Sequence, residues 1–380
     1  MNSATRKQED NAVEPMLYMA LELSNTTWKL TFGDGAKRRQ GSVPAGDMGK
    51  LREALAQAKQ RLGLPAATRV VSCYEAGRDG FWLHRQLRNM GVENDVVDSS
   101  SIEVDRRKRR AKTDRIDGEH LLTKLMRYHA GERGGWSVVH VPSVAEEDAR
   151  RLHRELERLK HERASHQCRL QALLVTQGIR AKVDAGFGRR IEALKLWDGS
   201  ALPQGLKGEL QREHERLKLL EEQIKALEGE RRERLRAPSS PAERQVVQLM
   251  RLGAIGPASA WLFVMEFFGW RALRNRREVA ALAGLAGTPY NSGDSEQDQG
   301  ISKAGNRRVR AMAVEIAWLW LRYQPHSALA QWYQRRFAGG GKRMRRVGIV
   351  ALARRILVAL WRYLEHGVLP EGARLIASRG

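Results

Sequence analysis

Two aspartates in the first third of the chain have a spacing that suits metal-assisted chemistry. Asp114 and Asp117 open a segment with a helical pattern that runs to about Tyr128, and residues three apart on a helix share a face. Paired carboxylates supply the oxygen ligands that a hard divalent cation prefers, whereas Arg and Lys bind phosphate. The two together suggest chemistry on a phosphate backbone, but these residues taken alone favour the alternative of a solvated helix start, where acids are common. The cationic run before the two acids comprises Arg106, Arg107, Lys108, Arg109, Arg110 and Lys112.

Two glutamates fall where strands are predicted. Glu22 lies within the apolar run 17–23, where a carboxylate is costly unless it has a partner. Glu75 follows the predicted strand 69–74, and open α/β sheets bind ligands at the carboxyl ends of their strands. Taken singly, Glu22 could face solvent on an edge strand and Glu75 could be a turn residue before Gly77. With the two aspartates they form an ordered set of four acids on the ends and edges of one sheet, which could converge on one or two hard divalent cations.

A serine in the C-terminal third is a candidate nucleophile. Ser292 precedes Gly293 in a stretch predicted to be a polar loop, and no histidine is near it in the sequence. A hydroxyl that attacks phosphorus would split a strand exchange into two reversible steps, and the nearby cations Lys303, Arg307 and Arg308 could stabilise the developing charge. A turn serine is the alternative, and the sequence chemistry taken alone favours it.

Composition restricts the class of protein. The 380 residues include 67 Lys and Arg against 44 Asp and Glu, a formal charge of +23, and 42% of them are hydrophobic. A chain with a real core and this excess of cations indicates a polyanionic partner, for which nucleic acid is the first candidate and a membrane surface the other. We find no apolar stretch that could span a bilayer and no signal-peptide pattern, so we expect a cytoplasmic, nucleoid-associated protein without a membrane partner. Cys73 and Cys168 match no metal spacing and are expected to be buried thiols.

Hydrophobic periodicity predicts three parts. The first part alternates strands with helices and is expected to be an α/β layer fold. The second has two helical segments with leucine seams, which indicates either an antiparallel helical hairpin or a dimerising coiled coil. The third is mainly helical, and the glycines 339–341 in it precede a basic patch. The patch, a predicted joint before the last helix, comprises Lys342, Arg343, Arg345 and Arg346. The predicted strands are 17–23, 28–32, 39–43, 69–74 and 96–97, and the predicted helices are 48–62, 81–90, 112–128, 144–178, 206–227, 246–252, 258–268, 274–283, 309–323 and 347–364.

The four acids, in this order, resemble the acidic tetrad of the DEDD transposases. The matching pieces are the segments 20–24, 74–77 and 112–117, although that family usually has Asp where this chain has Glu22. These transposases are insertion-sequence recombinases with an RNase H-type, RuvC-like N-terminal domain, and they are related to pilin-gene invertases. The resemblance implies that Glu22, Glu75, Asp114 and Asp117 bind Mg²⁺.

The C-terminal part resembles the second signature of the same transposases, those of the insertion-sequence one-ten type. The segments 284–293, 300–303 and 305–310 carry this likeness, and Gly287 replaces a proline that is common in the motif. The resemblance implies that Ser292 is the nucleophile that attaches to DNA. It also implies a noncoding guide RNA as a partner, which the basic composition allows.

These observations predict a DNA transposase with three domains. Residues 1–135 are expected to form a RuvC-like metal-binding domain, 136–240 a helical coiled-coil segment, and 241–380 a mainly α-helical transposase domain that carries the serine. The partners would be donor and target DNA, the guide RNA, and further copies of the chain in a homodimer or homotetramer. Two alternatives stay open: a RuvC-like, metal-dependent junction nuclease that needs only the acids, and a catalytically decayed nucleic-acid-binding protein that needs only the basic patches.

Overall fold

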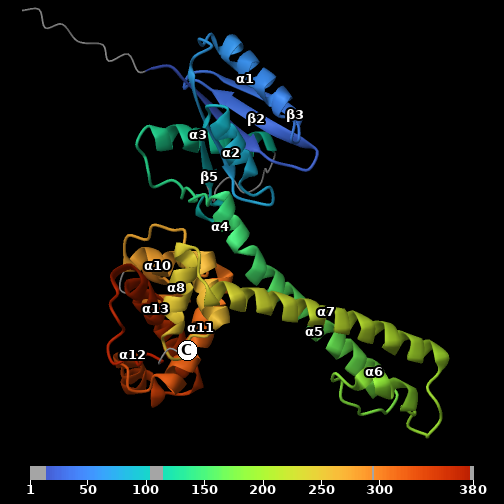
Figure 1. Cartoon of the computed structure of the whole chain (residues 1–380). Helices are drawn as coiled ribbons and strands as arrows, with labels where there is room; N and C mark the ends of the chain where they lie inside the picture. Colours follow the sequence, from blue (N-terminus) through green and yellow to red (C-terminus); the bar gives the residue numbers. More distant parts are fainter. Residues whose placement is uncertain (1–13, 103–113, 293–294, 377–380) are drawn as a thin grey trace, which may run out of the picture. The chain divides into compact units, whose positions relative to one another are not determined.

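The protein forms two compact units, Met1–Val141 and Pro142–Gly380, which are described separately. The structure is a computed structural model that describes residues 14–102, 114–292 and 295–376 (Figure 1). The first unit is mixed α/β and the second is mostly helical, as the sequence predicts. None of the helices within the described ranges has the length and apolarity that crossing a bilayer requires.

A five-stranded sheet in the order β3-β2-β1-β4-β5 organises the first unit. The first three strands form an antiparallel meander, and β4 and β5 run parallel to β1. A tight turn joins β1 to β2, in which the Ser24 hydroxyl donates to the Thr27 carbonyl oxygen at 2.6 Å. All five predicted strands are therefore confirmed, and two parallel strands lie side by side at the centre of the sheet. The strands are β1 (Met16–Glu22), β2 (Thr27–Gly33), β3 (Arg38–Pro44), β4 (Arg69–Glu75) and β5 (Glu93–Val97).

Helices cover both faces of this sheet. Helices α1 (Met48–Leu62) and α2 (Trp82–Asn89) pack on the face that carries the odd-numbered residues of β1, such as Leu17 and Leu21. Helix α3 (Asp114–His129) packs on the opposite face, against Ala20 of β1 and its neighbours on β4. Since side chains alternate along a strand, each apolar run supplies both cores. Helix α1 keeps its predicted bounds because the Asp47 side chain caps its first turn and Gly63 ends it at φ 72°.

Two long helices of the second unit pair in an antiparallel hairpin. Helix α5 (Arg151–Val175) lies along α7 (Gln204–Arg236), and leucines such as Leu156 and Leu170 are buried between them (Figure 1). The short helices α6 (Phe187–Arg190) and η3 (Ile191–Ala193) lie in the connection between them. The structure thus shows the intramolecular hairpin, one of the two arrangements that the leucine seams predicted, and it contains a single chain.

The C-terminal helices surround a core that includes Trp261, Phe263 and Trp320, all fully buried. The buried Gln324 amide donates to the Gly253 and Arg374 carbonyl oxygens at 3.1 and 2.9 Å, which joins the chain's last described segment to this core. The elements are α8 (Pro241–Met250), α9 (Pro257–Phe263), η4 (Val264–Phe268, a π-helical turn), α10 (Arg276–Leu282), β6 (Gly287–Ser292), β7 (Ser295–Ile301), α11 (Arg307–Tyr323), α12 (Ala328–Tyr333), η5 (Gln334–Ala338) and α13 (Lys342–His366).

Several predictions for this unit were wrong in detail. The single helix 144–178 is two helices, α4 (Val144–Ala149) and α5, because the Arg150 N–H bonds the Glu147 carbonyl in a tighter turn. The last helix begins at Lys342 rather than at 347, so the basic patch is its first turn and not a joint. Cys168 is exposed, because it lies on the outer side of α5, whereas Cys73 is buried as expected.

Candidate active site and nucleic-acid interface

The two glutamates of the predicted metal site end adjacent parallel strands. Glu22 is the last residue of β1 and Glu75 the last residue of β4, and the register pairs Ala20 with Cys73 two residues earlier. Because side chains two apart on a strand share a face, both glutamates belong to the face that α3 covers. Burial, with the charges of Asp95 and Glu75, raises the pKa of the Cys73 thiol well above its usual value, in agreement with that orientation.

Helix α3 begins at the same edge of the sheet. Gly118 lies so close to Thr31 that a Cβ on it would come within 2.5 Å of the threonine hydroxyl, and Leu122 packs on Gly33. In the sheet register these two β2 residues pair with residues 20 and 18 of β1, so α3 runs from the carboxyl end of β1 towards its amino end. The first turn of the helix, which holds Asp114 and Asp117, therefore starts near the end of β1 that carries Glu22.

The four acids are donors of the type that a hard cation prefers, but the placement of their backbones does not demonstrate a metal site. Four carboxylates are suitable oxygen ligands for Mg²⁺. Within the ranges that the structure describes, no three acidic, histidine or cysteine side chains form a group that could hold a metal ion. The Asp114 side chain lies outside what is described, and so do the residues 106–110 and Lys112 of the cationic run. The metal site remains a prediction.

Ser292 lies in a β-hairpin, not in the loop that the sequence predicted. It is the last residue of β6 and pairs with Ser295, the first residue of β7. The prediction of a loop was wrong because hydrogen bonds between the two backbones stabilise the strands. Such strands need no alternating apolar residues, so the sequence shows no strand pattern here. The hairpin places the Ser292 backbone at the end of a two-stranded ribbon.

Glycines fix the base of this hairpin. Gly305 has φ +125°, and a Cβ there would lie 2.3 Å from the Leu282 carbonyl oxygen. Gly284 has φ +67°, and its carbonyl accepts from the Lys303 N–H at 3.2 Å. Asn306 follows and caps α11, where its side chain accepts from two backbone N–H groups of the first turn. The glycines of the C-terminal signature thus have a structural role, because they allow the backbones on either side of the hairpin to touch.

The predicted phosphate-binding residues of this signature differ in their surroundings. Arg308 forms an ion pair with Glu157 of α5, with its Nε 2.6 Å from the carboxylate. Arg307 is exposed in the first turn of α11, and Lys303 lies in the left-handed region at φ 57°. Lys303 is the residue of these three that lines a groove.

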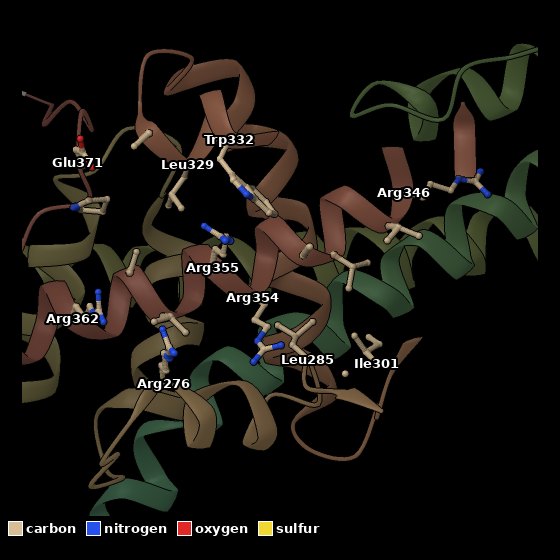
Figure 2. Close-up of a pocket in the computed structure, with 18 of the residues that line it drawn as sticks. Arg276, Leu285, Ile301, Leu329, Trp332, Arg346, Arg354, Arg355, Arg362 and Glu371 are labelled. Carbon is tan, nitrogen blue, oxygen red and sulfur yellow. The ribbon is translucent and has the colours of Figure 1, made fainter. Parts of the chain in front are cut away.

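That groove has a volume of about 1200 Å³ and runs along α13 (Figure 2). Its other walls come from α10, from the base of the β6–β7 hairpin, from α12 and from the segment 368–371. Six cations line the groove, and within the part of the chain that the structure describes none of them has a carboxylate partner. One acid, Glu371, also lines the groove. The cations are Arg276, Lys303, Arg346, Arg354, Arg355 and Arg362.

Sequence reasoning found two of these cations, Lys303 and Arg346, and missed the other four. Arg346, Arg354 and Arg362 recur every eight residues, but at 3.6 residues per turn each step turns about 80° around the helix, so this recurrence alone does not place them on one side. Arg355 stands over the Trp332 ring, with its guanidinium carbon 3.9 Å from the ring centroid (Figure 2). Burial, with the charges of Arg336 and Arg354, lowers the pKa of Arg355, as expected where cations gather.

A buried ion pair links the helical hairpin to this region. Glu266, in the π-helical turn η4, is 1% exposed, and Arg154 of α5 donates to both its carboxylate oxygens at 2.6 and 2.9 Å. Burial opposes ionisation of Glu266, but the Arg154 hydrogen bonds and charge outweigh it and lower the pKa of the carboxyl. The Glu266 carbonyl also lies 3.4 Å from the Asn306 amide, so the network reaches the residue that caps α11.

Comparisons with known proteins define the class. A model of the "Transposase IS116/IS110/IS902 family" matches residues 247–333, a span that contains the β6–β7 hairpin and Ser292. The chain is 43% identical over 374 residues to y4rJ of Sinorhizobium fredii (strain NBRC 101917 / NGR234), which is named as a transposase, and the match covers 94% of each chain. The protein is therefore of the transposase class.

Two further relatives agree with this class. The protein y4qE of the same strain, also named as a transposase, is 28% identical over 307 residues, which cover 79% of this chain and 70% of that one. The transposase for insertion sequence element IS1328 of Yersinia enterocolitica is 27% identical over 183 residues, 48% of this chain and 53% of that one. The chain belongs to the IS116/IS110/IS902 family of insertion-sequence transposases.

Proposed function

We propose that this transposase cuts and rejoins DNA strands with a metal-binding acidic tetrad and a serine nucleophile. One observation carries the proposal: the two central parallel strands of the N-terminal sheet both end in a glutamate on the face over which α3 begins. A second supports it, because the family model spans the hairpin that bears Ser292. The proposed chemistry uses residues of both units.

The N-terminal unit is proposed to be of the RNase H/RuvC-like type and to hold Mg²⁺, with Mn²⁺ as a substitute. The ligands would be Glu22, Glu75, Asp114 and Asp117, whose backbones lie at or near one edge of the sheet. Bound Mg²⁺ would orient the scissile phosphate and stabilise the attacking and leaving oxygens. Glu22 has one methylene more than the aspartate that is usual in the DEDD transposases, so its carboxylate reaches further from β1.

The covalent step is assigned to the Ser292 hydroxyl. Its Oγ would attack the phosphorus of a DNA phosphodiester, the bond from phosphorus to one sugar oxygen would break, and that sugar would leave as a hydroxyl carrying the proton. Attack by the hydroxyl of another strand would reverse the step and release the serine. Because each step exchanges one phosphodiester for another, strands are rejoined without a separate energy source.

Donor and target DNA are the proposed substrates, and a noncoding guide RNA is the proposed second partner. The charge of +23 supports binding of polyanions in general. A homodimer or homotetramer is the proposed assembly, which would allow two DNA ends to be handled together.

A substitution series in a transposition assay tests the proposal. Asp114→Asn should abolish both strand cutting and transposition while DNA binding stays within about twofold, since one neutralised acid changes few phosphate contacts. Ser292→Ala should abolish transposition and the protein–DNA linkage. Asp148→Asn and Ser302→Ala, at exposed positions outside the proposed site, are the matched controls and should transpose normally.

The same series separates the alternatives. Normal transposition by Ser292→Ala would contradict the serine mechanism. Wild-type cleavage without any covalent linkage, unchanged in Ser292→Ala and lost in Asp114→Asn, would indicate the junction nuclease. Tight binding with no cleavage by the wild type, in the presence of Mg²⁺ and the element's RNA, would indicate a decayed binding protein.

A further inference from the structure

The groove along α13 combines two surfaces of different chemistry. Its six cations, defined above, line a depression whose remaining walls are largely apolar, with Leu285, Ile301 and Leu329 among them (Figure 2). Arg355 points towards Trp332 and Arg354 towards Leu285, so charged groups alternate with apolar ones along the helix (Figure 2). An exposed apolar wall favours an apolar partner, and a cluster of cations without carboxylates attracts an anionic one.

The spacing of the cations is regular. Arg346, Arg354 and Arg362 are eight residues apart on α13, so each step rises about 12 Å along the helix axis and turns about 80° around it, and the row winds obliquely over the helix surface. Val350 and Val358 fill the intervening positions of the same row and also line the groove. A ligand that matches this row must therefore carry negative charge repeatedly along its length, with flat or apolar groups between the charges.

We propose that this groove binds an unpaired nucleic-acid strand, with its phosphates on the α13 arginines and its bases against the apolar wall and the Arg355–Trp332 stack. Grooves of this kind in other proteins combine cations that follow the backbone with aromatic groups that contact bases. Bases also stack on guanidinium planes, so the exposed Arg355 extends the platform that Trp332 begins. This binding goes beyond the proposed strand exchange, because it requires neither Ser292 nor the acidic tetrad.

Other ligands fit the groove less well. A small molecule would contact only part of the groove, since Arg346 and Arg362 are about 24 Å apart along the axis of α13 at 1.5 Å per residue. A duplex presents phosphates outside and keeps its base faces stacked inside, so it would leave the apolar wall without a partner. An acidic peptide would satisfy the cations, but it lacks the flat groups that the Arg355–Trp332 stack accommodates.

Fluorescence anisotropy with the full-length protein tests the assignment. The probes are labelled oligo-dT and oligo-rU of about 12 nucleotides, within the site sizes of single-strand grooves, and a duplex of the same length. The wild type should bind both single strands more tightly than the duplex. The double variant Arg354→Gln/Arg362→Gln should weaken single-strand binding at least tenfold, and its salt dependence should fall by about 1.4 in log–log slope, or about 0.7 for each lost phosphate contact.

A matched variant excludes a general charge effect. Arg232→Gln/Arg236→Gln removes the same charge from exposed positions of α7, outside the groove, and should weaken binding less than threefold. Trp332→Leu should weaken single-strand binding at least fivefold and leave duplex binding unchanged. Arg354 and Arg362 are exposed, so their variants should fold, and circular dichroism should match the wild type.

The outcomes are distinct. Equal losses in the α13 and α7 double variants, or a wild type that prefers duplex, would overturn the proposal. Self-association that disappears in Arg354→Gln/Arg362→Gln, with no single-strand binding, would assign the groove to a second copy of the chain and also overturn it. A preference between oligo-dT and oligo-rU identifies the strand as DNA or RNA. Ser292→Ala should bind as the wild type does, so failure of the catalytic proposal leaves this one standing.

Discussion

The ion pair between Arg154 and Glu266 should contribute strongly to the stability of the C-terminal unit. Replacing Arg154 by Met keeps much of the aliphatic packing but leaves the Glu266 carboxylate, which is 1% exposed, without its bidentate partner. Breaking a buried pair in this way costs about 3–5 kcal/mol. The Arg154 side chain is 46% exposed, so water can reach part of the vacated space. We therefore expect a loss of about 2 kcal/mol at neutral pH.

The loss should depend on pH with a defined sign. In the wild type the pKa of Glu266 is lowered, so its contribution is present above the unfolded-state pKa of about 4.3 and is lost as pH falls through the lower folded value. In Arg154→Met burial remains without the Arg154 hydrogen bonds, and the charges of Arg150 and Arg308 offset it only in part, so the pKa of Glu266 should rise from its wild-type value. The variant then carries a penalty at pH 7 that disappears as Glu266 takes up a proton, and the difference between the proteins should shrink towards pH 4.

Urea unfolding followed by tryptophan fluorescence measures this difference, because seven of the ten tryptophans lie in the second unit. The control is Arg151→Met, which removes a 3.4 Å pair with Asp148 in which both side chains are more than three-quarters exposed. Exposed pairs contribute little, so this change should cost less than about 0.5 kcal/mol. A loss in Arg154→Met no larger than in Arg151→Met, or one that is constant between pH 4 and 7, would refute the reasoning.

Three further predictions concern stability. Gly305→Ala should destabilise the second unit by at least about 2 kcal/mol in urea unfolding, because Gly305 has a positive φ and an added Cβ would lie 2.3 Å from the Leu282 carbonyl oxygen. The control Gly229→Ala, in a helix with open space around it, should stabilise the unit by up to about 1 kcal/mol. Gln324→Leu should cost about 2–4 kcal/mol by the same measurement, since it removes three hydrogen bonds between the buried Gln324 side chain and partly buried backbone groups of Gly253 and Arg374. Hydrogen bonds outweigh burial and lower the pKa of Glu243 to about 2, so the loss in Glu243→Gln should be about 2 kcal/mol at pH 7 and should decline as pH falls from about 4.5 towards 2. No loss in Gly305→Ala or Gln324→Leu, or a pH-independent loss in Glu243→Gln, would contradict these accounts.

Local signals in the sequence predicted the first unit well. The helix Met48–Leu62 forms at its predicted bounds because a capping aspartate precedes it and a glycine with positive φ follows it. Most of the strands were found because they are apolar or alternating runs between turn residues, whereas β3, which has the polar sequence RRQGSVP and one buried residue, Val43, shows no such pattern. Glu22 and Glu75 lie at one edge of the sheet because their strands are parallel neighbours in a particular register. The order of residues in the sequence suggests that arrangement, and the structure gives the register.

The second unit was predicted less completely, because its special features arise from contacts between distant segments. The hairpin 287–301 has no alternating apolar pattern, and its base depends on glycines that meet backbone some twenty residues away. The groove combines Arg276, Lys303 and Arg354 from three separate elements, so no single stretch of sequence displays it. The ion pair between Arg154 and Glu266 joins residues 112 positions apart in the same way.

The most direct test of the catalytic account is covalent trapping of the protein on DNA. Purified wild type and Ser292→Ala would each be mixed with Mg²⁺, DNA carrying the element's junction, and the element's own RNA, and then run on a denaturing gel. The account predicts a protein–DNA adduct in the wild type that is absent in Ser292→Ala and present in the control Ser302→Ala. An adduct that persists in Ser292→Ala, or DNA cleaved by the wild type without any adduct, would contradict it.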